Sequence, residues 1–285
     1  MDNSLTITPI AGALGAEVSG ISLASSPSER TFERIREAFL TYHVLFFRDQ
    51  TLTPQEQLAF AERWGDIHVH PFVEGLPQCP EVLEILKTET DTRNFGGRWH
   101  SDQMFSPTPA MCTLLYAKEI PAHGGDTMFA DMQLAYDHLS STMQNLLGSL
   151  RGFNAGDNAK RYGGLSRKEL YGSTMSQMRV KEPTEEVVTN AFHPIVRTHP
   201  DTGRKGLYLG SHTQGLEDFS DHDAAPLIEF LQQHCIKPDF TCRFRWRVGD
   251  MAMWDNRCVQ HYALNDYAGQ RRRMHRVTVK GDTPY

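Results

Sequence analysis

The chain has 285 residues and a formal net charge of −6 at pH 7, and 39% of its residues are hydrophobic. This length suits a single domain, residues 1–285, with enough bulk to bury a core. The acidic balance and the lack of a long basic tract exclude nucleic acid as an expected partner. No apolar run reaches the length that a membrane span needs, so we expect no membrane partner either.

Cysteine usage indicates the compartment. Five cysteines stand at positions 79, 112, 235, 242 and 258, an odd number without any Cys-x-x-Cys pair. The first residues carry an acid and no basic segment ahead of an apolar stretch, which argues against a secretory signal. Reduced thiols are usual in the cytosol. We therefore expect a cytoplasmic protein.

The N-terminal half alternates short apolar runs with helical patterns. Residues 5–23 alternate loosely around several glycines and predict short strands joined by turns. Thr53-Pro54-Gln55-Glu56 is a capping box with proline at the first helical position, which predicts a helix start. Apolar spacing predicts helices over about 28–41, 53–64 and 131–139, and strands at 44–47, 82–86 and 111–117.

The C-terminal half is denser in strands. Residues 152–190 are polar, with glycine-rich spots and few apolar anchors, and predict a lid-like insertion. A helix is expected at about 223–235, where Pro226 is tolerable only in the first turn. Strands are expected at 195–197, 207–209, 241–248, 251–254 and 274–279. Short strands with flanking helices favour a mostly β, α+β fold built on a double-stranded β-helix, or jelly roll.

The chemistry centres on Trp99-His100-Ser101-Asp102 and the distant His261. If this segment is extended, the side chains of His100 and Asp102 point to the same face. A histidine from elsewhere would complete two imidazoles and one carboxylate around a metal. Non-haem Fe(II) oxygenases use such a facial triad, because it leaves coordination positions open for cosubstrate and oxygen.

A cluster of arginines near the C-terminus suggests anionic ligands. On an extended strand Arg272, Met274 and Arg276 share one face, and the residues between them share the other. Buried guanidinium groups without partners are costly, so a pocket that holds two of them expects anions. A guanidinium suits a carboxylate or sulfonate through paired hydrogen bonds. The alternative is that one or both pair with an internal Asp or Glu.

Several motifs together resemble the taurine dioxygenase family of Fe(II)/2-oxoglutarate-dependent oxygenases, which includes the aryloxyalkanoate dioxygenases. The resemblance spans Ile7 to about Lys280 and rests on residues 68–71 (HVHP), 99–102 (WHSD), 124–127 (GGDT), 193–194 (HP), 197–200 (RTHP), 254–257 (WDNR) and 275–276 (HR). It implies a dioxygenase that uses Fe(II), 2-oxoglutarate and O2 and releases succinate and CO2. The implied substrate is a small organic anion, either a sulfonate such as taurine or an aryloxyalkanoate or other carboxylate. Cleavage of a C–S or C–O bond follows where the attacked carbon bears sulfur or oxygen.

The resemblance also implies roles for individual residues. His100, Asp102 and His261 match the iron ligands. Arg272 and Thr127 match the residues that bind the distal carboxylate of 2-oxoglutarate. Further residues are candidates for binding the substrate, either because they match substrate contacts or because they stand near positions where the taurine branch contacts its substrate: His70, Asn94, Gln103, Tyr208 and Arg276.

Other interpretations stay open. Two histidines and a carboxylate also bind catalytic zinc, so a zinc hydrolase is one rival. A non-catalytic binding protein is another, and an oxygenase of the same family acting on a larger secondary metabolite, covered by residues 152–190, is a third. His68, His193 and His199 are interpreted as structural polar residues, and Asn256 as the support of a turn. Family members are commonly dimers or tetramers, so a homodimer or homotetramer is expected.

Overall fold

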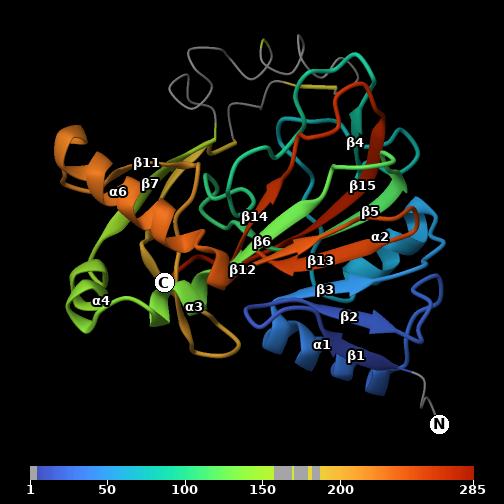
Figure 1. The fold of residues 1–285 in the computed structure, drawn as a ribbon, viewed down its shortest axis with the longest axis horizontal. Coiled ribbons are helices and arrows are strands. Elements are labelled where there is room, and N and C mark those ends of the chain that lie inside the picture. The colour runs from blue at the N-terminus through green and yellow to red at the C-terminus, as the bar shows by residue number, and fades with distance from the viewer. Residues whose placement is uncertain (1–4, 157–168, 170–178, 182–186) are drawn as a thin grey trace.

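The computed structural model describes residues 5–156, 169, 179–181 and 187–285 (Figure 1). The expected lid at 152–190 therefore lies mostly outside the described residues. Within those residues, no helix combines the length and the apolar character that crossing a membrane requires.

A seven-stranded sheet forms the largest layer, and its central strands come from distant parts of the chain. All neighbouring strands are antiparallel except β2 and β3, which are parallel. The strands follow the order β1 (Thr6–Pro9), β2 (Ala16–Ser19), β3 (Val44–Phe47), β13 (Met251–Asp255), β5 (Ala110–Glu119), β15 (Arg272–Lys280) and β4 (Leu83–Lys87).

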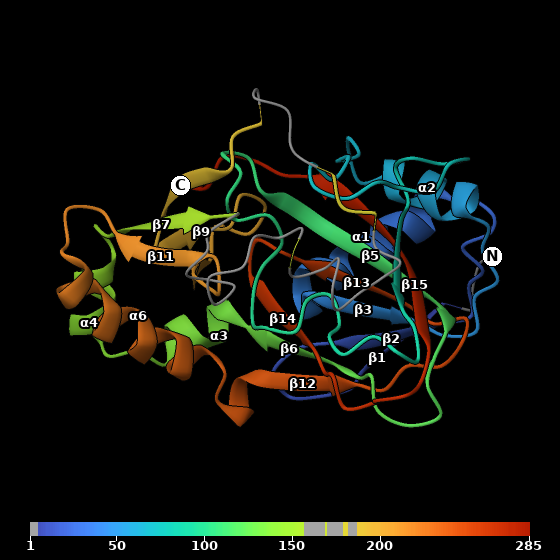
Figure 2. The same cartoon turned by 90° about the horizontal axis from the view of Figure 1, so that it is seen from above.

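Two helices, α1 (Glu29–Tyr42) and α2 (Pro54–Glu62), cover one face of this sheet (Figure 2). The predicted capping box starts α2, because the Thr53 side chain accepts from the backbone of Glu56 and the Glu56 side chain accepts from the backbone of Thr53. Apolar residues of both helices pack on the strand residues whose side chains point to this side. Among them are Phe32, Ile35, Phe39, Phe60, Leu45, Phe47, Leu114, Met253 and Val277.

A smaller antiparallel sheet covers the other face, in the order β12 (Thr241–Phe244), β6 (Thr127–Asp131) and β14 (Val259–Ala263). Phe46 on β3 stacks on Phe244 with ring centroids 4.0 Å apart, and lies 5.7 Å from the ring of Phe129. Buried apolar side chains of both sheets belong to one cluster. The two sheets therefore share a core, as in other sheet-on-sheet packings.

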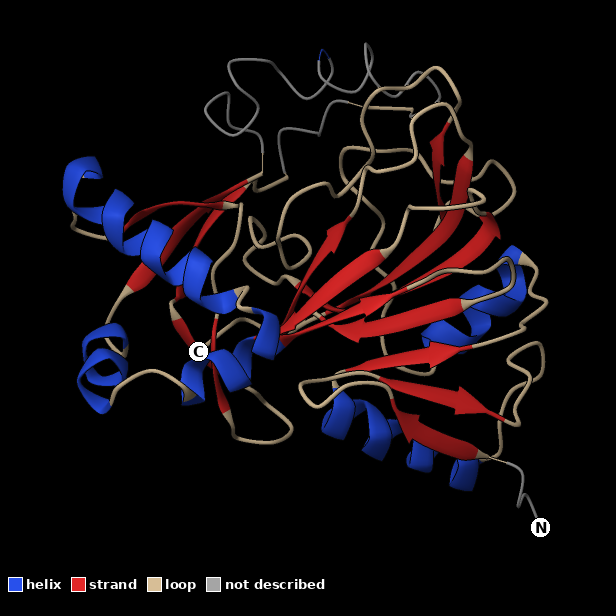
Figure 3. Cartoon of the chain, viewed as in Figure 1, coloured by secondary structure: helices blue, strands red, loops and turns tan. Residues whose placement is uncertain are grey.

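The remaining elements form a helical and sheet region beside the two sheets (Figure 3). It has its own apolar cluster, which includes Leu147, Ile195, Leu207 and Leu231. Its elements are α3 (Met132–Asp137), α4 (Ser141–Leu147), β7 (Arg151–Ala155), β8 (Asn190–Pro194), β9 (Val196–Thr198), β10 (Lys205–Leu207), β11 (Thr213–Leu216), α6 (Asp221–Cys235) and the short 3-10 helix η2 (Pro238–Phe240).

Most predicted elements are confirmed, but α4, β6, β7, β8 and β11 were not expected, and two expectations are wrong in detail. Residues 127–131 form β6, although no strand was expected there. The strand was missed because its two pairing partners, β12 and β14, lie far along the chain. The strand expected at 241–248 ends at Phe244. Helix α6 begins at Asp221 because Ser220 caps it, so Pro226 lies in the second turn and not in the first.

The stability of this fold should depend on pH through His275. His275 lies on β15 and is buried, and burial, with Lys118 and Arg273 nearby, lowers its pKa to about 4. An unfolded histidine titrates near 6.5, so the unfolded state binds more protons between pH 6.5 and 4. The free energy of unfolding should therefore fall as the pH is lowered through this window, by roughly 1 kcal/mol per pH unit for this group.

Urea unfolding at pH 7, 6 and 5 measures this dependence. His68, whose pKa is also lowered to about 4, acts in the same direction, so the informative quantity is the difference between two proteins. The His275→Gln variant should show a shallower loss of stability toward pH 5 than the original chain. An equally steep loss in both would contradict the assignment.

Candidate metal centre

The candidate centre forms where two distant segments meet. An isolated antiparallel bridge joins His100 to His261 on β14. The N–H of His100 donates to the carbonyl of His261 at 3.1 Å, and the N–H of His261 donates back at 2.8 Å. Directly opposed residues of an antiparallel pair project their side chains to the same face. The two imidazole rings consequently lie with centroids 4.2 Å apart.

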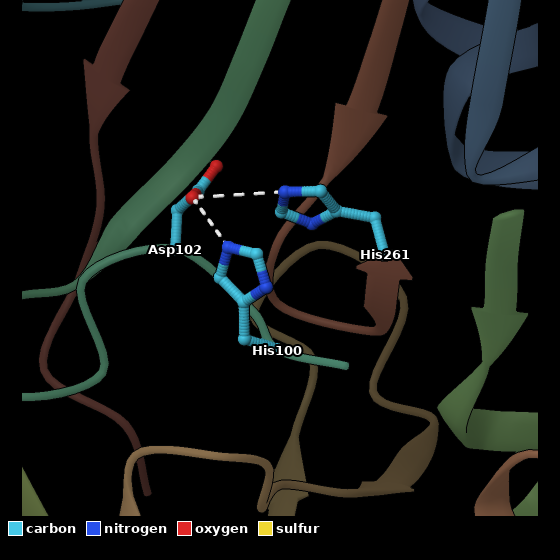
Figure 4. Close-up of side chains that lie close together, drawn as sticks. All are labelled: His100, Asp102 and His261. Atoms are coloured by element: carbon cyan, nitrogen blue, oxygen red, sulfur yellow. Dashed lines mark ion pairs between the residues drawn. The ribbon is translucent and has the colours of Figure 1, made fainter. Parts of the chain in front are cut away.

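Asp102 completes a group of three buried side chains (Figure 4). Its Oδ1 atom lies 3.6 Å from Nε2 of His100 and 3.8 Å from Nε2 of His261. One ligand atom from each residue lies within 4.8 Å of the others, so the three could share a single ion. Asp102 itself lies in a turn, and the following residue Gln103 has a positive φ of 57°. The turn, and not the fully extended segment expected from the sequence, brings its carboxylate to the histidines.

The protonation states suit a divalent metal. Nδ1 of His100 lies 2.7 Å from the carbonyl oxygen of Arg98, which favours the tautomer that leaves the Nε2 lone pair facing Asp102. Burial lowers the pKa of His261 well below its usual value. Burial would raise the pKa of Asp102, but the positive charge of Arg276 acts against it, and that pKa lies well below its usual value. A ring nitrogen with a free lone pair and an ionised carboxylate are the donors that Fe(II) and similar ions take.

Arg272 is a buried cation without an anionic partner among the described residues. It is 5% exposed, and its Nε and Nη2 atoms have no hydrogen-bond acceptor. Its guanidinium lies 5.8 Å from the ring of Trp246, whose Nε1 donates to Oγ1 of Thr127 at 2.9 Å. Gly125 has a φ of +72°, and a Cβ there would lie 3.3 Å from Cδ of Arg272. A cation held in this way calls for an anionic ligand.

Arg276 lies beside the metal ligands. Its Nη2 atom is 2.9 Å from Oδ1 of Asp102, and its Nε donates to Oγ1 of Thr278 at 3.2 Å. Of the two alternatives left open for the arginines, an internal acid therefore applies to Arg276. Arg276 also lines a small cavity with His68, His70 and Glu81.

His68 is a residue whose place at this cavity the sequence did not indicate. Burial and the charge of Arg276 lower its pKa to about 4, so the ring is neutral near pH 7. Its Nδ1 atom lies 3.2 Å from Nε2 of Gln103, which the turn after Asp102 positions. His70 accepts from the backbone N–H of Phe72 through Nδ1. The only hint in the sequence was that His68 stands two residues before His70.

The remaining substrate candidates lie in two other places. Nδ2 of Asn94 donates to the carbonyls of Ala263 and Leu264 at 2.8 and 3.1 Å, so its amide braces the chain after β14 and does not line the Arg276 cavity. Tyr208 is 2% exposed, and its ring packs against the guanidinium of Arg197 at 4.8 Å. Burial raises the pKa of Tyr208 to about 12. The structure therefore places His70 at the same cavity as Arg276, and Gln103 contacts the His68 that lines it, whereas Asn94 lies elsewhere.

A second group of possible ligands is already satisfied internally. His199, Asp255 and Cys258 lie close enough to hold an ion. However, Arg257 donates to both carboxylate oxygens of Asp255, at 2.8 and 2.7 Å, and His199 lies 3.0 Å from one of them. This group is a buried ion-pair network, which leaves the cluster around Asp102 as the better metal candidate.

Comparisons with known proteins agree with this geometry. Residues 6–278 match the family model described as Taurine catabolism dioxygenase TauD, TfdA family. An alpha-ketoglutarate-dependent sulfate ester dioxygenase of Pseudomonas putida is 33% identical over 281 residues, covering 98% of this chain and 91% of the relative. An alpha-ketoglutarate-dependent 2,4-dichlorophenoxyacetate dioxygenase of Cupriavidus pinatubonensis is 31% identical, covering 98% and 99%. A crystal structure of a taurine dioxygenase from Burkholderia xenovorans superposes with a TM-score of 0.82 at 30% identity, covering 99% and 92%.

Divalent metal should stabilise the protein through these three residues. Ligand at about 100 times its dissociation constant adds about 2.7 kcal/mol to the free energy of unfolding. Co(II), added without oxygen, should therefore raise the thermal midpoint. His261→Ala and Asp102→Asn should remove this rise, whereas His123→Ala, at an exposed position, should keep it. An equal rise in all four proteins would place the metal elsewhere.

Proposed function

Since the chain belongs to the Taurine catabolism dioxygenase TauD, TfdA family, we propose that it oxidises a small organic anion at the centre formed by His100, Asp102 and His261. It is a 2-oxoglutarate-dependent dioxygenase that uses Fe(II) and O2. One observation carries the assignment of residues: the described part of the chain holds both a group of two imidazoles and a carboxylate that could share an ion, and a buried arginine that no described carboxylate pairs with. A zinc hydrolase would give that arginine no role.

The three residues would hold Fe(II) through Nε2 of each histidine and Oδ1 of Asp102. When bound, iron and 2-oxoglutarate supply the oxidising power, since decarboxylation of 2-oxoglutarate to succinate and CO2 lets one oxygen atom of O2 enter the substrate as a hydroxyl group. The protein binds, orients and excludes water. Burial of all three ligands supports this role, because a metal among them is shielded from bulk solvent.

Arg272 and Thr127 would bind the distal carboxylate of 2-oxoglutarate. The free Nε and Nη2 donors of Arg272 match the paired acceptors of a carboxylate. Trp246 supports both residues, since its indole donates to Thr127 and its ring lies under Arg272. Arg272 and Thr127 would therefore hold one carboxylate of the diacid, which leaves the other end free to bind the metal.

The anionic group of the substrate would bind at Arg276, beside His68 and His70. The relatives are named for a sulfate ester, a dichlorophenoxyacetate and taurine, each of which carries an anionic group. Arg276 is 5% exposed and holds one anion, Asp102, so a substrate anion would give the guanidinium a second partner. If the hydroxylated carbon bears oxygen or sulfur, the product breaks at that C–O or C–S bond.

We further infer that the two facing sheets form a double-stranded β-helix. Strands β6, β12 and β14 face strands β3, β13, β5 and β15 across a shared apolar core, and His261 on β14 contacts Phe129 and Trp254 of that core. A jelly roll is the architecture expected from the sequence, and the two facing sheets support this proposal.

The thiols support a reducing compartment. All five cysteines are buried and free. Burial raises the pKa of Cys242 to about 12, so this thiol is protonated and unreactive near neutral pH. We propose a cytoplasmic location on this basis. The expected homodimer or homotetramer stays a prediction.

Succinate release tests the proposed activity. The protein is incubated with Fe(II), 2-oxoglutarate and O2 against a panel of alkyl sulfate esters, alkyl sulfonates and aryloxyalkanoates. At least one anionic class should raise succinate formation above the rate without substrate, and omission of O2 should abolish it. Product formation without O2 or 2-oxoglutarate would instead indicate a hydrolase.

The role of Arg272 is tested against its exposed neighbour. Arg272→Met removes two charge-assisted hydrogen bonds, which together contribute about 3 kcal/mol to binding. Their loss should raise the KM for 2-oxoglutarate roughly 100-fold. Arg271, the residue just before β15, is exposed and pairs with Glu89 at the surface. Arg271→Met should therefore leave that KM within about twofold, because exposed pairs contribute little. Equal effects of the two variants would refute the assignment.

A further inference from the structure

Asn256 lies fully buried just after β13, and its side-chain orientation follows from its neighbours. One end of its amide lies 3.1 Å from the backbone N of Asp102 and 3.0 Å from Nε1 of Trp254. Both neighbours can only donate, so this end is the oxygen Oδ1. The other end is therefore the NH2 group, and it lies 3.0 Å from Oγ1 of Thr113.

The direction of the next hydrogen bond follows from the first. Since Nδ2 of Asn256 donates to the hydroxyl of Thr113, the hydroxyl accepts there and keeps its own proton for another partner. That partner is Oδ2 of Asp102, 2.6 Å away. Hydrogen bonds from a hydroxyl to an ionised carboxylate have this length and are stronger than neutral ones. Thr113 and Asn256 are 0% exposed, so bulk water does not compete for these groups.

The two oxygens of Asp102 consequently have different surroundings. Oδ2 accepts the proton of Thr113, whereas Oδ1 faces Nε2 of both histidines and the guanidinium of Arg276. A carboxylate oxygen has two lone pairs, so Oδ1 can meet Arg276 and a metal together. A metal that bound both oxygens would use one of the positions that a facial triad leaves open.

We propose that Thr113, oriented by Asn256, is a positioning residue that keeps Asp102 bound to the metal through Oδ1 alone. The hydroxyl of Thr113 occupies Oδ2 and so preserves the positions that 2-oxoglutarate and O2 need. The inference rests on the proposed function, because it concerns the same metal centre. In this proposal, a threonine that is not itself a metal ligand determines how many coordination positions of the metal stay open.

The experiment compares Thr113→Val, which keeps the shape and removes the hydroxyl, with Thr113→Ser, which keeps the hydroxyl. Two quantities are measured without oxygen: the dissociation constant of Fe(II), by competition with a chelator, and the binding of 2-oxoglutarate to the iron-loaded protein, by its visible charge-transfer band. In Thr113→Val the freed Oδ2 should join the metal. Fe(II) should then bind as tightly as before or more tightly, and 2-oxoglutarate about tenfold more weakly. Thr113→Ser should behave like the original chain in both measurements.

Results of other kinds would overturn the proposal. If Thr113 had a purely structural role, Thr113→Val would weaken the binding of both Fe(II) and 2-oxoglutarate. If Thr113 had no role, both affinities would stay unchanged. The thermal midpoint of the metal-free variants checks folding. If Thr113→Val does not fold, Thr113→Ala provides the same test, since it also removes the hydroxyl that donates to Oδ2 of Asp102 and adds no charge. Failure of the original chain to give the charge-transfer band would instead count against the proposed function itself.

Discussion

Two backbone hydrogen bonds between His100 and His261 hold the candidate metal centre together. The segment before Asp102 is irregular, so its place depends on this pairing, on the amide of Asn94 and on the Ser101 hydroxyl, which donates to the carbonyl of Val259. β14 pairs in turn with β6, which carries Thr127. A single set of strand pairings therefore positions both the metal ligands and the proposed cosubstrate site.

The buried charges differ in whether they have a partner of opposite charge, and this difference indicates where an anionic ligand is needed. Asp102 has Arg276 and two imidazoles around it, whereas Arg272 has no carboxylate within ion-pair distance among the described residues. A buried cation that lacks a partner destabilises the empty protein. The binding of an anion would relieve that cost, so the unpaired charge that destabilises the empty protein would favour the proposed binding of a diacid. Arg257 is the opposite case, because it donates hydrogen bonds to both carboxylate oxygens of Asp255.

Much of the fold could be predicted from local patterns, and the errors have physical causes. The capping box at Thr53 and the apolar face of α1 depend on neighbours within a few residues, and both are confirmed. Strand β6 was missed because it is defined by pairing with β12 and β14, which lie far along the chain. His68 was interpreted as structural because nothing near it in sequence shows that Arg276 would lie beside it.

The sequence by itself determined the chemical types: two histidines and an aspartate suited to a metal, and arginines that alternate along a strand so that Arg272 is buried while Arg271 is exposed. These features follow from residue identity and from the two-residue period of a strand. Only the tertiary structure decided which arginine would find an internal acid, that Asn94 would brace the backbone, and that Thr113 and Asn256 would fix the orientation of Asp102. Such contacts join residues that are distant along the chain, and their hydrogen-bond partners are set by strand pairing and not by local sequence.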